Sequence, residues 1–185
     1  MKVLTPTVST WIITMMFAAG FVVSRSDAQT QSDENSDRIM RERIAIIFEE
    51  TIKSGETRIF DLNGHPITAT TFMPPTNEHV EEIRRYGEKA IPVLTGYLNR
   101  PTGFEKHLAL RFLGSIGGER IIDPLRKVAL NDPSASFRST ALLWLSGVRW
   151  DLAAPIIRHA AKKDSSAEVR MQAKAILAQH QMGEP

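Results

Sequence analysis

Histidine is the side chain in this sequence with the widest chemistry, because imidazole can act as a general base or ligate a metal ion. The sequence holds five histidines and no cysteine. The histidines are His65, His79, His107, His159 and His180. No two of them are three or four residues apart, so no helix face presents a pair of imidazole ligands. The spacing predicts no metal site.

Other catalytic signatures are also missing. The glycine-rich segment Gly114–Gly118 (GSIGG) has no preceding strand and no following Lys-Ser or Lys-Thr pair, both of which a phosphate-binding loop needs. No serine stands in a Gly-x-Ser-x-Gly turn, and without cysteine there is no thiolate nucleophile. We therefore expect no catalytic residue, no cofactor and no enzymatic activity.

Two arginines stand in a repeated relationship to aspartate. Arg138 and Arg170 each follow an aspartate, Asp132 and Asp164, by six residues. A guanidinium and a carboxylate in this arrangement can tie successive turns of chain together. We predict that these four residues form a structural ladder that stabilises the stacking of repeated units. Lys106 occupies the corresponding place in the first unit without an aspartate before it, so we expect it to lack such a partner.

A second group of cations points to binding. When the predicted helices are aligned on their prolines, Thr95, Lys127 and Arg158 become equivalent, and so do Asn99, Asn131 and Lys162. With the adjacent cations the stripe contains Arg126, Lys127, Arg158, Lys162 and Lys163. A stripe that becomes more basic toward the C-terminus favours an acidic protein segment or an anionic polymer as partner. A merely solvated helix face is the alternative.

These residues belong to a repeat of about 32 residues, a period typical of stacked supersecondary units. Lys106, Arg138 and Arg170 follow one another at one constant interval, which Ala109, Ala141 and Ala173 keep, as do Leu113, Leu145 and Leu177. Pro92, Pro124 and Pro155 nearly keep it, with the second step one position shorter. Units repeated in this way bury their apolar faces against their neighbours.

The apolar periodicity and the turn residues predict the elements of each unit. Paired helices are expected at 88–99 and 103–114, 119–130 and 134–146, and 151–163 and 166–180. Their short connections favour antiparallel neighbours. Each proline is expected in the first helical turn, where its missing N–H costs little.

The segment before the repeats, residues 37–86, lacks the 32-residue repeat and is predicted to contain other elements. We predict a helix from Asp37 to Gly55 and a capping helix that ends at Tyr86. Between them, TRIFDL (57–62) and PITATTF (66–72) flank Asn63-Gly64, which favours a β-hairpin. An extended linker with a turn is the alternative.

Residues 1–28 resemble a targeting segment. The run from Trp11 to Val23 is uncharged and mostly apolar, and Ser26 and Ala28 suit a signal peptidase. We expect residues 1–28 to be a cleaved signal peptide and the protein to be exported, to the periplasm or outside the cell, with no membrane span after cleavage. An uncleaved anchor is the alternative, although the run is short for a span. Polar residues 29–36 are predicted to form a disordered leader, and 181–185 a tail.

The charge balance excludes one class of partner. The chain has 23 Lys and Arg against 21 Asp and Glu, a net charge of +2. Removing Lys2, Arg25 and Asp27 with the signal leaves 21 against 20, or +1. A body so close to neutral gives no indication of nucleic-acid binding.

Two segments carry a family resemblance. Asn131–Leu145 (NDPSASFRSTALLWL) and Lys163–Leu177 (KDSSAEVRMQAKAIL) resemble the Asp-x-Ser-x-x-Val-Arg-x-x-Ala-x-x-x-Leu helix of HEAT-like repeats, of the short type first recognised in phycobilin lyases. Gly117–Leu130 is similar to the other helix of that unit. The resemblance extends from Gly87 to about His180, with a divergent first unit at Phe104-Glu105-Lys106.

The resemblance implies an all-α fold: an α-solenoid of about three helix pairs (87–180), with the N-terminal helix and small β-hairpin as a cap. It also implies that the Pro-containing helices line the concave face. The family includes scaffolds, lyases and hydroxylases, so the fold alone does not fix a function. The His-Glu pairs of a hydroxylase are missing here. A bilin lyase would act on cytoplasmic antenna proteins, which conflicts with export.

We therefore expect an exported, non-catalytic scaffold that binds a partner protein on its repeat surface. The alternatives are an accessory subunit that positions a cell-envelope enzyme, and a lyase, isomerase or hydroxylase of the HEAT-like group.

Overall fold

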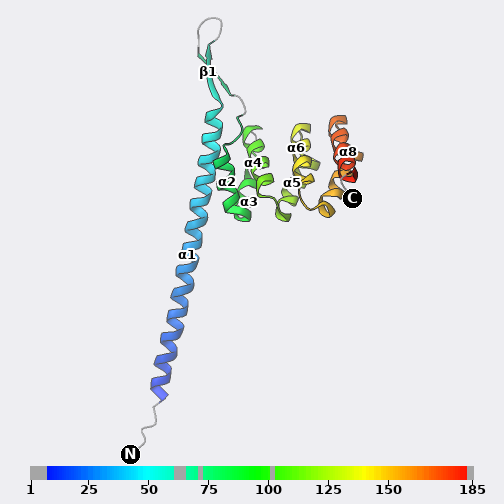
Figure 1. Cartoon of the computed structure of the whole chain (residues 1–185). Coiled ribbons are helices and arrows are strands. Elements are labelled where there is room, and N and C mark those ends of the chain that lie inside the picture. Colours follow the sequence, from blue (N-terminus) through cyan, green and yellow to red (C-terminus); the bar gives the residue numbers. More distant parts are fainter. Residues whose placement is uncertain (1–7, 61–65, 71–72, 101–102, 183–185) are drawn as a thin grey trace, which may run out of the picture. The chain divides into compact units, whose positions relative to one another are not determined.

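The structure, a computed structural model, describes residues 8–60, 66–70, 73–100 and 103–182, and the side chains of 29–56, 73–100 and 103–182. In chain order the elements are α1 (Val8–Ser54), β1 (Glu56–Phe60), β2 (Pro66–Thr70), α2 (Asn77–Tyr86), α3 (Ile91–Leu98), α4 (Gly103–Ile116), α5 (Ile122–Asn131), α6 (Ala135–Ser146), α7 (Trp150–Lys163) and α8 (Ala167–Met182) (Figure 1). The 3-10 turns η1 (Gly87–Ala90) and η2 (Glu119–Ile121) lead into α3 and α5. The chain divides within α1 into two compact units, Met1–Glu42 and Arg43–Pro185.

Helix α1 includes residues 29–36, where the sequence predicted a disordered leader, and so begins well before Asp37. No glycine or proline interrupts the segment 29–54. Within the first unit Arg38 bonds Glu42 one turn ahead (Nη1–Oε1 2.9 Å) and Asn35 one turn behind (Nη2–Oδ1 2.9 Å). Side-chain pairs at these spacings stabilise a polar helix, which a composition argument for disorder overlooks.

The predicted signal peptide, residues 1–28, lies outside the described side chains. Among the helices in the described part of the chain, none is long and apolar enough to cross a membrane.

Two short strands follow α1. β1 pairs with β2 in antiparallel fashion, with Glu56 opposite Thr70 and Phe60 opposite Pro66. The Asn63-Gly64 turn, on which the hairpin prediction depended, falls in residues 61–65, which are outside the described chain.

The repeat region consists of stacked helix pairs. α3 packs on α4, α5 on α6 and α7 on α8, while α2, α4, α6 and α8 follow one another in one layer (Figure 1). The pairs match the predicted ranges to within a few residues at each boundary. Gly87 and Gly118 have positive φ angles of 55° and 80°, so the turns before α3 and α5 need a residue without a Cβ.

The core lies between the helix layers and repeats with the sequence. Ala109, Ala141 and Ala173 are fully buried, because only a small side chain fits where neighbouring helices approach closely. Leu113 and Leu145 are fully buried as well, whereas Leu177, on the last helix, is half-buried. The periodic spacing of alanine and leucine therefore describes packing.

The prolines do not mark equivalent positions, and the alignment based on them is wrong. Pro124 is buried, whereas Pro92 and Pro155 are exposed, and Pro155 lies in the interior of α7, beyond its first turn. The pattern of buried and exposed residues in α5 recurs in α7 at the interval between Ala109 and Ala141. The interval between Pro124 and Pro155 is one residue shorter and does not reproduce it. Proline is tolerated at several positions near a helix start, so it fixes no register. The correct partners of Lys127 and Asn131 are His159 and Lys163.

Candidate functional site

Polar contacts join each repeat to the next. Lys106 Nζ lies 2.8 Å from Asp132 Oδ2, and Arg138 binds Asp164 in bidentate fashion, with Nε–Oδ2 and Nη2–Oδ1 distances of 2.8 Å. In both cases the cation and the aspartate are 26 residues apart, so the pair spans two repeats. The two carboxylates are only 6% and 5% exposed. We call these contacts the inter-repeat ladder.

Each aspartate is held by the turn in which it stands. Asp132 Oδ1 accepts a hydrogen bond from the N–H of Ser134 (2.9 Å), and Asp164 Oδ1 accepts one from the N–H of Ser166 (2.8 Å). These bonds close the turns that lead into α6 and α8, which explains the Asp-x-Ser spacing of the sequence. The hydrogen bond from Arg138 lowers the pKa of Asp164, with smaller contributions from the Ser166 N–H and from charge.

The ladder differs from the predicted one in its partners. Arg138 does not bind the carboxylate of Asp132, six residues before it; its Nη1 donates to the Asp132 carbonyl oxygen instead (2.8 Å). Arg170 likewise donates from Nη1 to the carbonyl oxygens of Asp164 (2.7 Å) and Ser165 (3.0 Å). The expectation that Lys106 lacks an aspartate partner is wrong, because its partner belongs to the following repeat.

Two equivalent pockets lie between successive repeats, on the side where the ladder runs. The first, of about 450 Å³, is lined by residues of α3, α4, α5 and the turn after α5; they include Thr95, Asn99, Lys106, Lys127, Asn131 and Asp132. The second, of about 260 Å³, is lined by Leu130, Arg138, His159, Ala160, Lys163, Asp164 and Ser165. A shift by one repeat relates Lys106, Lys127, Asn131 and Asp132 to Arg138, His159, Lys163 and Asp164. The pockets therefore repeat with the chain.

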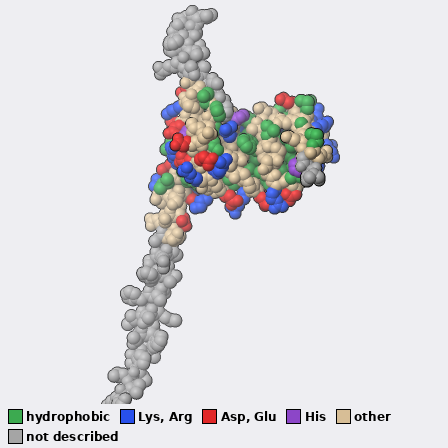
Figure 2. Space-filling model, viewed as in Figure 1, with side chains coloured by type: hydrophobic (Ala, Val, Ile, Leu, Met, Phe, Trp, Pro, Cys, Tyr) green, Lys and Arg blue, Asp and Glu red, His purple; other side chains and the backbone are tan. Residues whose placement is uncertain are grey.

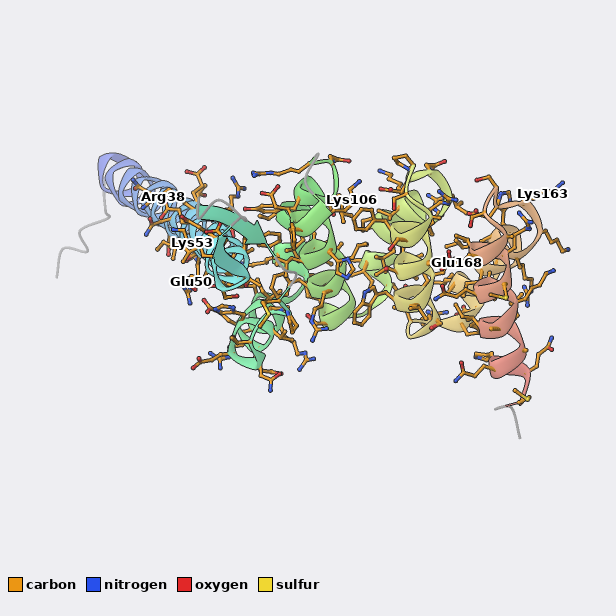
Figure 3. The ribbon with its side chains drawn as sticks, turned by 90° about the horizontal axis from the view of Figure 1, so that it is seen from above. Arg38, Glu50, Lys53, Lys106, Lys163 and Glu168 are labelled. Carbon is orange, nitrogen blue, oxygen red and sulfur yellow. The ribbon has the colours of Figure 1, made fainter. Side chains whose placement is uncertain are left out.

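The five predicted partner-binding cations are all exposed. Lys127 lines the first pocket and Lys163 the second, while Arg158 and Lys162 lie beside them on the exposed face of α7 and line neither. Figure 3 shows Lys163 at the opposite end of the repeat region from Lys106. Arg126 is set apart, because its Nη2 pairs with Asp123 Oδ1 at 2.8 Å. Within the described residues, no ion pair engages Lys127, Arg158, Lys162 or Lys163.

His159 and Asn131 join these cations in the pockets. Neither was predicted as a binding residue, although Asn131 stood in the aligned set with Asn99 and Lys162. The signal was present: His159 follows Lys127 at the same interval that separates Ala109 from Ala141. It was hidden by the alignment on proline, which placed Arg158 there.

The turns on the other side of the repeats carry balanced charge. Arg120 pairs with Glu88 (3.0 Å), and Arg149 pairs with both Glu119 and Asp151. Blue Lys and Arg side chains accordingly alternate with red Asp and Glu side chains along the lower edge of the repeat region in Figure 2. These acidic residues are neutralised locally, so they do not offset the cations near the pockets.

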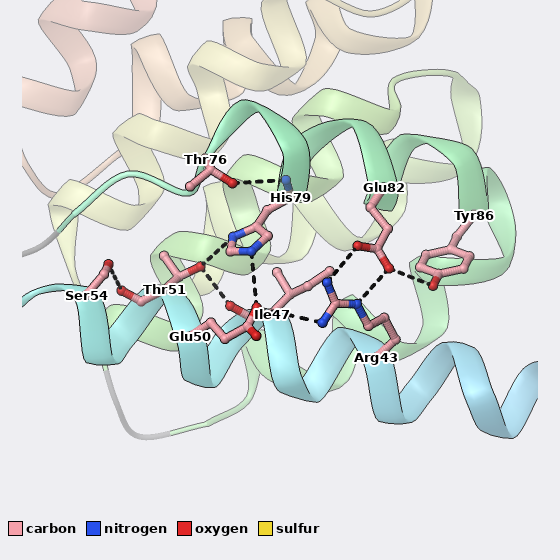
Figure 4. Close-up of polar contacts among 9 residues, drawn as sticks. All are labelled: Arg43, Ile47, Glu50, Thr51, Ser54, Thr76, His79, Glu82 and Tyr86. Atoms are coloured by element: carbon pink, nitrogen blue, oxygen red, sulfur yellow. Dashed lines mark hydrogen bonds and ion pairs between the residues drawn. The ribbon is translucent and has the colours of Figure 1, made fainter.

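A separate polar network joins the C-terminal part of α1, within the second unit, to α2 (Figure 4). Arg43 binds both carboxylate oxygens of Glu82 (2.9 and 3.1 Å), which also accepts a bond from Tyr86 (3.1 Å). His79 Nε2 lies 3.2 Å from Glu50 Oε2. The Arg43 hydrogen bond lowers the pKa of Glu82, and burial raises the pKa of Tyr86. Every carboxylate here has a cation or a histidine beside it, which suits a structural role.

The two tryptophans of the repeat region pack within the array. Trp144 of α6 lies against Gly114 of α4, and an added Cβ there would stand 2.1 Å from the indole. Trp150 stacks on His180, with ring centroids 3.7 Å apart and planes inclined by 8°. In the part of the chain that the structure describes, no group of three or more His, Asp or Glu side chains could hold a metal ion.

Comparison with known proteins identifies the repeats. Residues 91–178 match the family model for HEAT repeats, so the chain contains a HEAT repeat region. Among solved structures, the complex of CpcE and CpcF of phycocyanin lyase from Nostoc sp. PCC7120 is similar, with 20% sequence identity and a TM-score of 0.44. The match covers 54% of this chain and 65% of that chain, so it spans less than two thirds of the solved chain. No curated protein matches.

Proposed function

We propose that this protein is a non-catalytic scaffold that binds an acidic segment of a partner protein along the first helices of its repeats. The binding surface consists of Lys127, Arg158, Lys162 and Lys163, with Arg126 at its edge and His159 and Asn131 in the pockets. We call it the basic face.

One observation carries the proposal: the acidic groups next to the basic face are already engaged, and the cations are not. Asp132 and Asp164 are nearly buried and bound by Lys106 and Arg138. Lys127, Arg158, Lys162 and Lys163 are exposed and enter no ion pair in the described residues. An array of unpaired cations beside neutralised carboxylates attracts an anionic chain and orients it.

The two pockets add a reason for choosing an extended segment. They lie one repeat apart and offer amide and cationic groups at equivalent places, Asn131 in the first and Lys163 in the second. A peptide with acidic side chains at a matching interval would occupy both.

Fluorescence polarisation tests the proposal with a labelled oligoglutamate peptide, using an oligoglutamine peptide as the neutral control. We expect the first to bind and the second not to, and we expect binding to weaken as salt is added. Changing Lys127, Arg158 and Lys163 to Glu should weaken binding of oligoglutamate by at least about tenfold.

The matched control reverses three exposed cations elsewhere: Arg41, Arg85 and Lys89. This variant has the same net charge as the first one. If it weakens peptide binding as much, net charge and not the basic face is responsible, and the proposal fails.

We further propose that residues 1–28 direct export and are removed, and that the strand pair with α2 caps the N-terminal edge of the array. Terminal units of a solenoid need such a cover because their outer faces have no neighbouring repeat. N-terminal sequencing of the protein recovered from the cell envelope or medium tests the first point: a start at Gln29 is expected, and a start at Met1 would contradict it.

A further inference from the structure

The inter-repeat ladder is incomplete at its last step. Arg138 uses Nη1 for two carbonyl oxygens of its own repeat and Nε with Nη2 for the carboxylate of Asp164 in the next repeat. Arg170 makes the same two carbonyl contacts through Nη1. No acceptor for its Nε and Nη2 lies among the described residues. Arg170 is therefore held in the same way as Arg138, but among the described residues no carboxylate binds its Nε and Nη2.

Helix α8 also has, like earlier helices, a small residue at the position that contacts the next repeat. Two helices of this layer, α4 and α6, present a small residue to the next repeat: Gly114 lies under Trp144, and Ser146 shares a pocket with Ile176. The corresponding residue of α8, one repeat later, is Ala178, which is exposed. Small side chains at this point allow a side chain of the following helix to enter.

An apolar stripe runs along the exposed face of α8, flanked by the polar residues Glu168, Gln179 and Gln181. It carries Ala167, Met171, Ala175, Ala178 and Met182, and Met171 and Met182 are 68% and 81% exposed. Lys174 lies within this stripe, at the position where Leu110 and Leu142 are fully buried in the two earlier repeats. A lysine there keeps the free face polar, and a molecule that buries its ammonium group has to offer it an acceptor, for which a carboxylate is the most favourable.

We propose that the outer face of α8 is a second interaction surface, which takes a HEAT-type helix pair of another protein as a continuation of the array. That helix pair carries an aspartate in its turn, which binds Nε and Nη2 of Arg170, and a second acidic residue opposite Lys174. Charge complementarity selects this partner over a second copy of the chain. In the first repeat of a second copy, the position equivalent to Asp132 is Arg100, which would repel Arg170.

This surface is distinct from the basic face. It lies on α8 and the end of the array, while the basic face lies on α5 and α7. A variant of one is therefore a control for the other.

The test tethers a stand-in for the partner to the full chain. A copy of residues 151–182 is added after Met182, with Lys174→Leu in the natural repeat because the added copy offers no matching acid. The added aspartate, equivalent to Asp164, then stands 26 residues after Arg170, as in the earlier repeats. Tethering provides a high effective concentration, so a weak affinity is enough for docking.

We expect helix content by circular dichroism to rise with the added residues. We also expect Arg170→Gln to lower the melting temperature by at least about 5 °C more in the extended chain than in the unextended Lys174→Leu chain. Replacing the added aspartate by asparagine should have a comparable effect. Equal effects of Arg170→Gln in the two chains, or an extension that stays unfolded, would overturn the proposal.

Light scattering on the natural chain shows whether another protein or a second copy of this chain covers the outer face of α8. A monomer agrees with the proposal. A dimer that dissociates in Met171→Glu would show that a second copy covers α8 and would refute the choice of partner. Binding of oligoglutamate to the basic face should be unchanged in Met171→Glu, so failure here is separable from failure of the proposed function.

Discussion

The guanidinium of Arg138 binds the carboxylate of Asp164 in the following repeat, and only the carbonyl oxygen of Asp132 in its own. The hydrogen bond to Asp164 raises the pKa of Arg138, so the pair stays ionised in the folded protein. Both side chains are nearly buried, 8% and 5% exposed. The contact is therefore an interaction between repeats and couples their stability.

Removing the arginine of this pair should destabilise the protein strongly. Arg138→Gln leaves the Asp164 carboxylate buried without its cation, which we expect to cost about 2–4 kcal/mol of unfolding free energy. Urea denaturation followed by circular dichroism measures the loss. The double variant with Asp164→Asn should lose less than the sum of the single variants. Additive losses would show that the two side chains do not interact.

The same pair predicts a response to acid. The pKa of Asp164 is lower in the folded state than its ordinary value of 3.8. Its carboxylate therefore stabilises the protein at pH values above 3.8, and this contribution is lost as the pH falls through the pKa of the folded state. Stability should therefore decline from about pH 4 downward. In Asp164→Asn the decline should be shallower. Urea midpoints measured between pH 2 and 6 test this, and parallel curves for the two proteins would contradict it.

His107 predicts a separate change near neutral pH. Burial, assisted by the charge of Arg111, lowers its pKa below the ordinary value of 6.5. The neutral form is thus favoured by folding, so its contribution is complete above pH 6.5 and is lost as the pH falls from 6.5 to the folded value. Stability should decrease as the pH falls below about 6.5, and His107→Gln should reduce the slope. A proton NMR titration of the ring that gave a value at or above 6.5 would exclude this.

Gly114 should resist even the smallest substitution. A Cβ at this position would lie 2.1 Å from two atoms of the Trp144 ring, so Gly114→Ala forces the indole to move. We expect a loss of about 1–3 kcal/mol in unfolding free energy, recovered in part by Trp144→Leu. Urea denaturation of the single and double variants measures both changes.

Gly96 provides the matched control for Gly114. It also lies in a helix, α3, but a Cβ there meets no atom within 4 Å. Gly96→Ala should therefore stabilise the protein slightly, by about 0.5–1 kcal/mol, because alanine favours helix. A loss in both variants would point to glycine flexibility and not to the indole contact.

Much of the repeat region could be predicted from the sequence, because packing itself is periodic. Ala109, Ala141 and Ala173 recur once in every repeat and are all fully buried, and the helix pairs lie where the turn residues placed them. The alignment on prolines gave the wrong register, because a proline restricts the backbone but does not determine which face of the helix it lies on. That error of one residue exchanged Arg158 for His159 in the second pocket.

The partners of the cations could not be predicted in the same way. An aspartate six residues before Arg138 is close in sequence, but the turn brings its carbonyl oxygen, not its carboxylate, to the guanidinium. Lys106 and Asp132 are 26 residues apart, and only the stacking of repeats brings them together. A spacing within one unit could suggest a charge pair; it could not show that the pair crosses to the next.

The direction of these contacts has a consequence for how the chain can change in length. Both ladder contacts join a cation to an aspartate 26 residues later, so duplicating one whole repeat inside the array would give each cation a new aspartate at the same distance. Deleting one whole repeat would likewise leave each remaining cation with an aspartate 26 residues later. An insertion of another length inside a helix would shift its register, separate the partners and leave buried charges unpaired. Gain or loss of a whole repeat therefore keeps the ladder contacts, whereas gain or loss of part of a helix would break them.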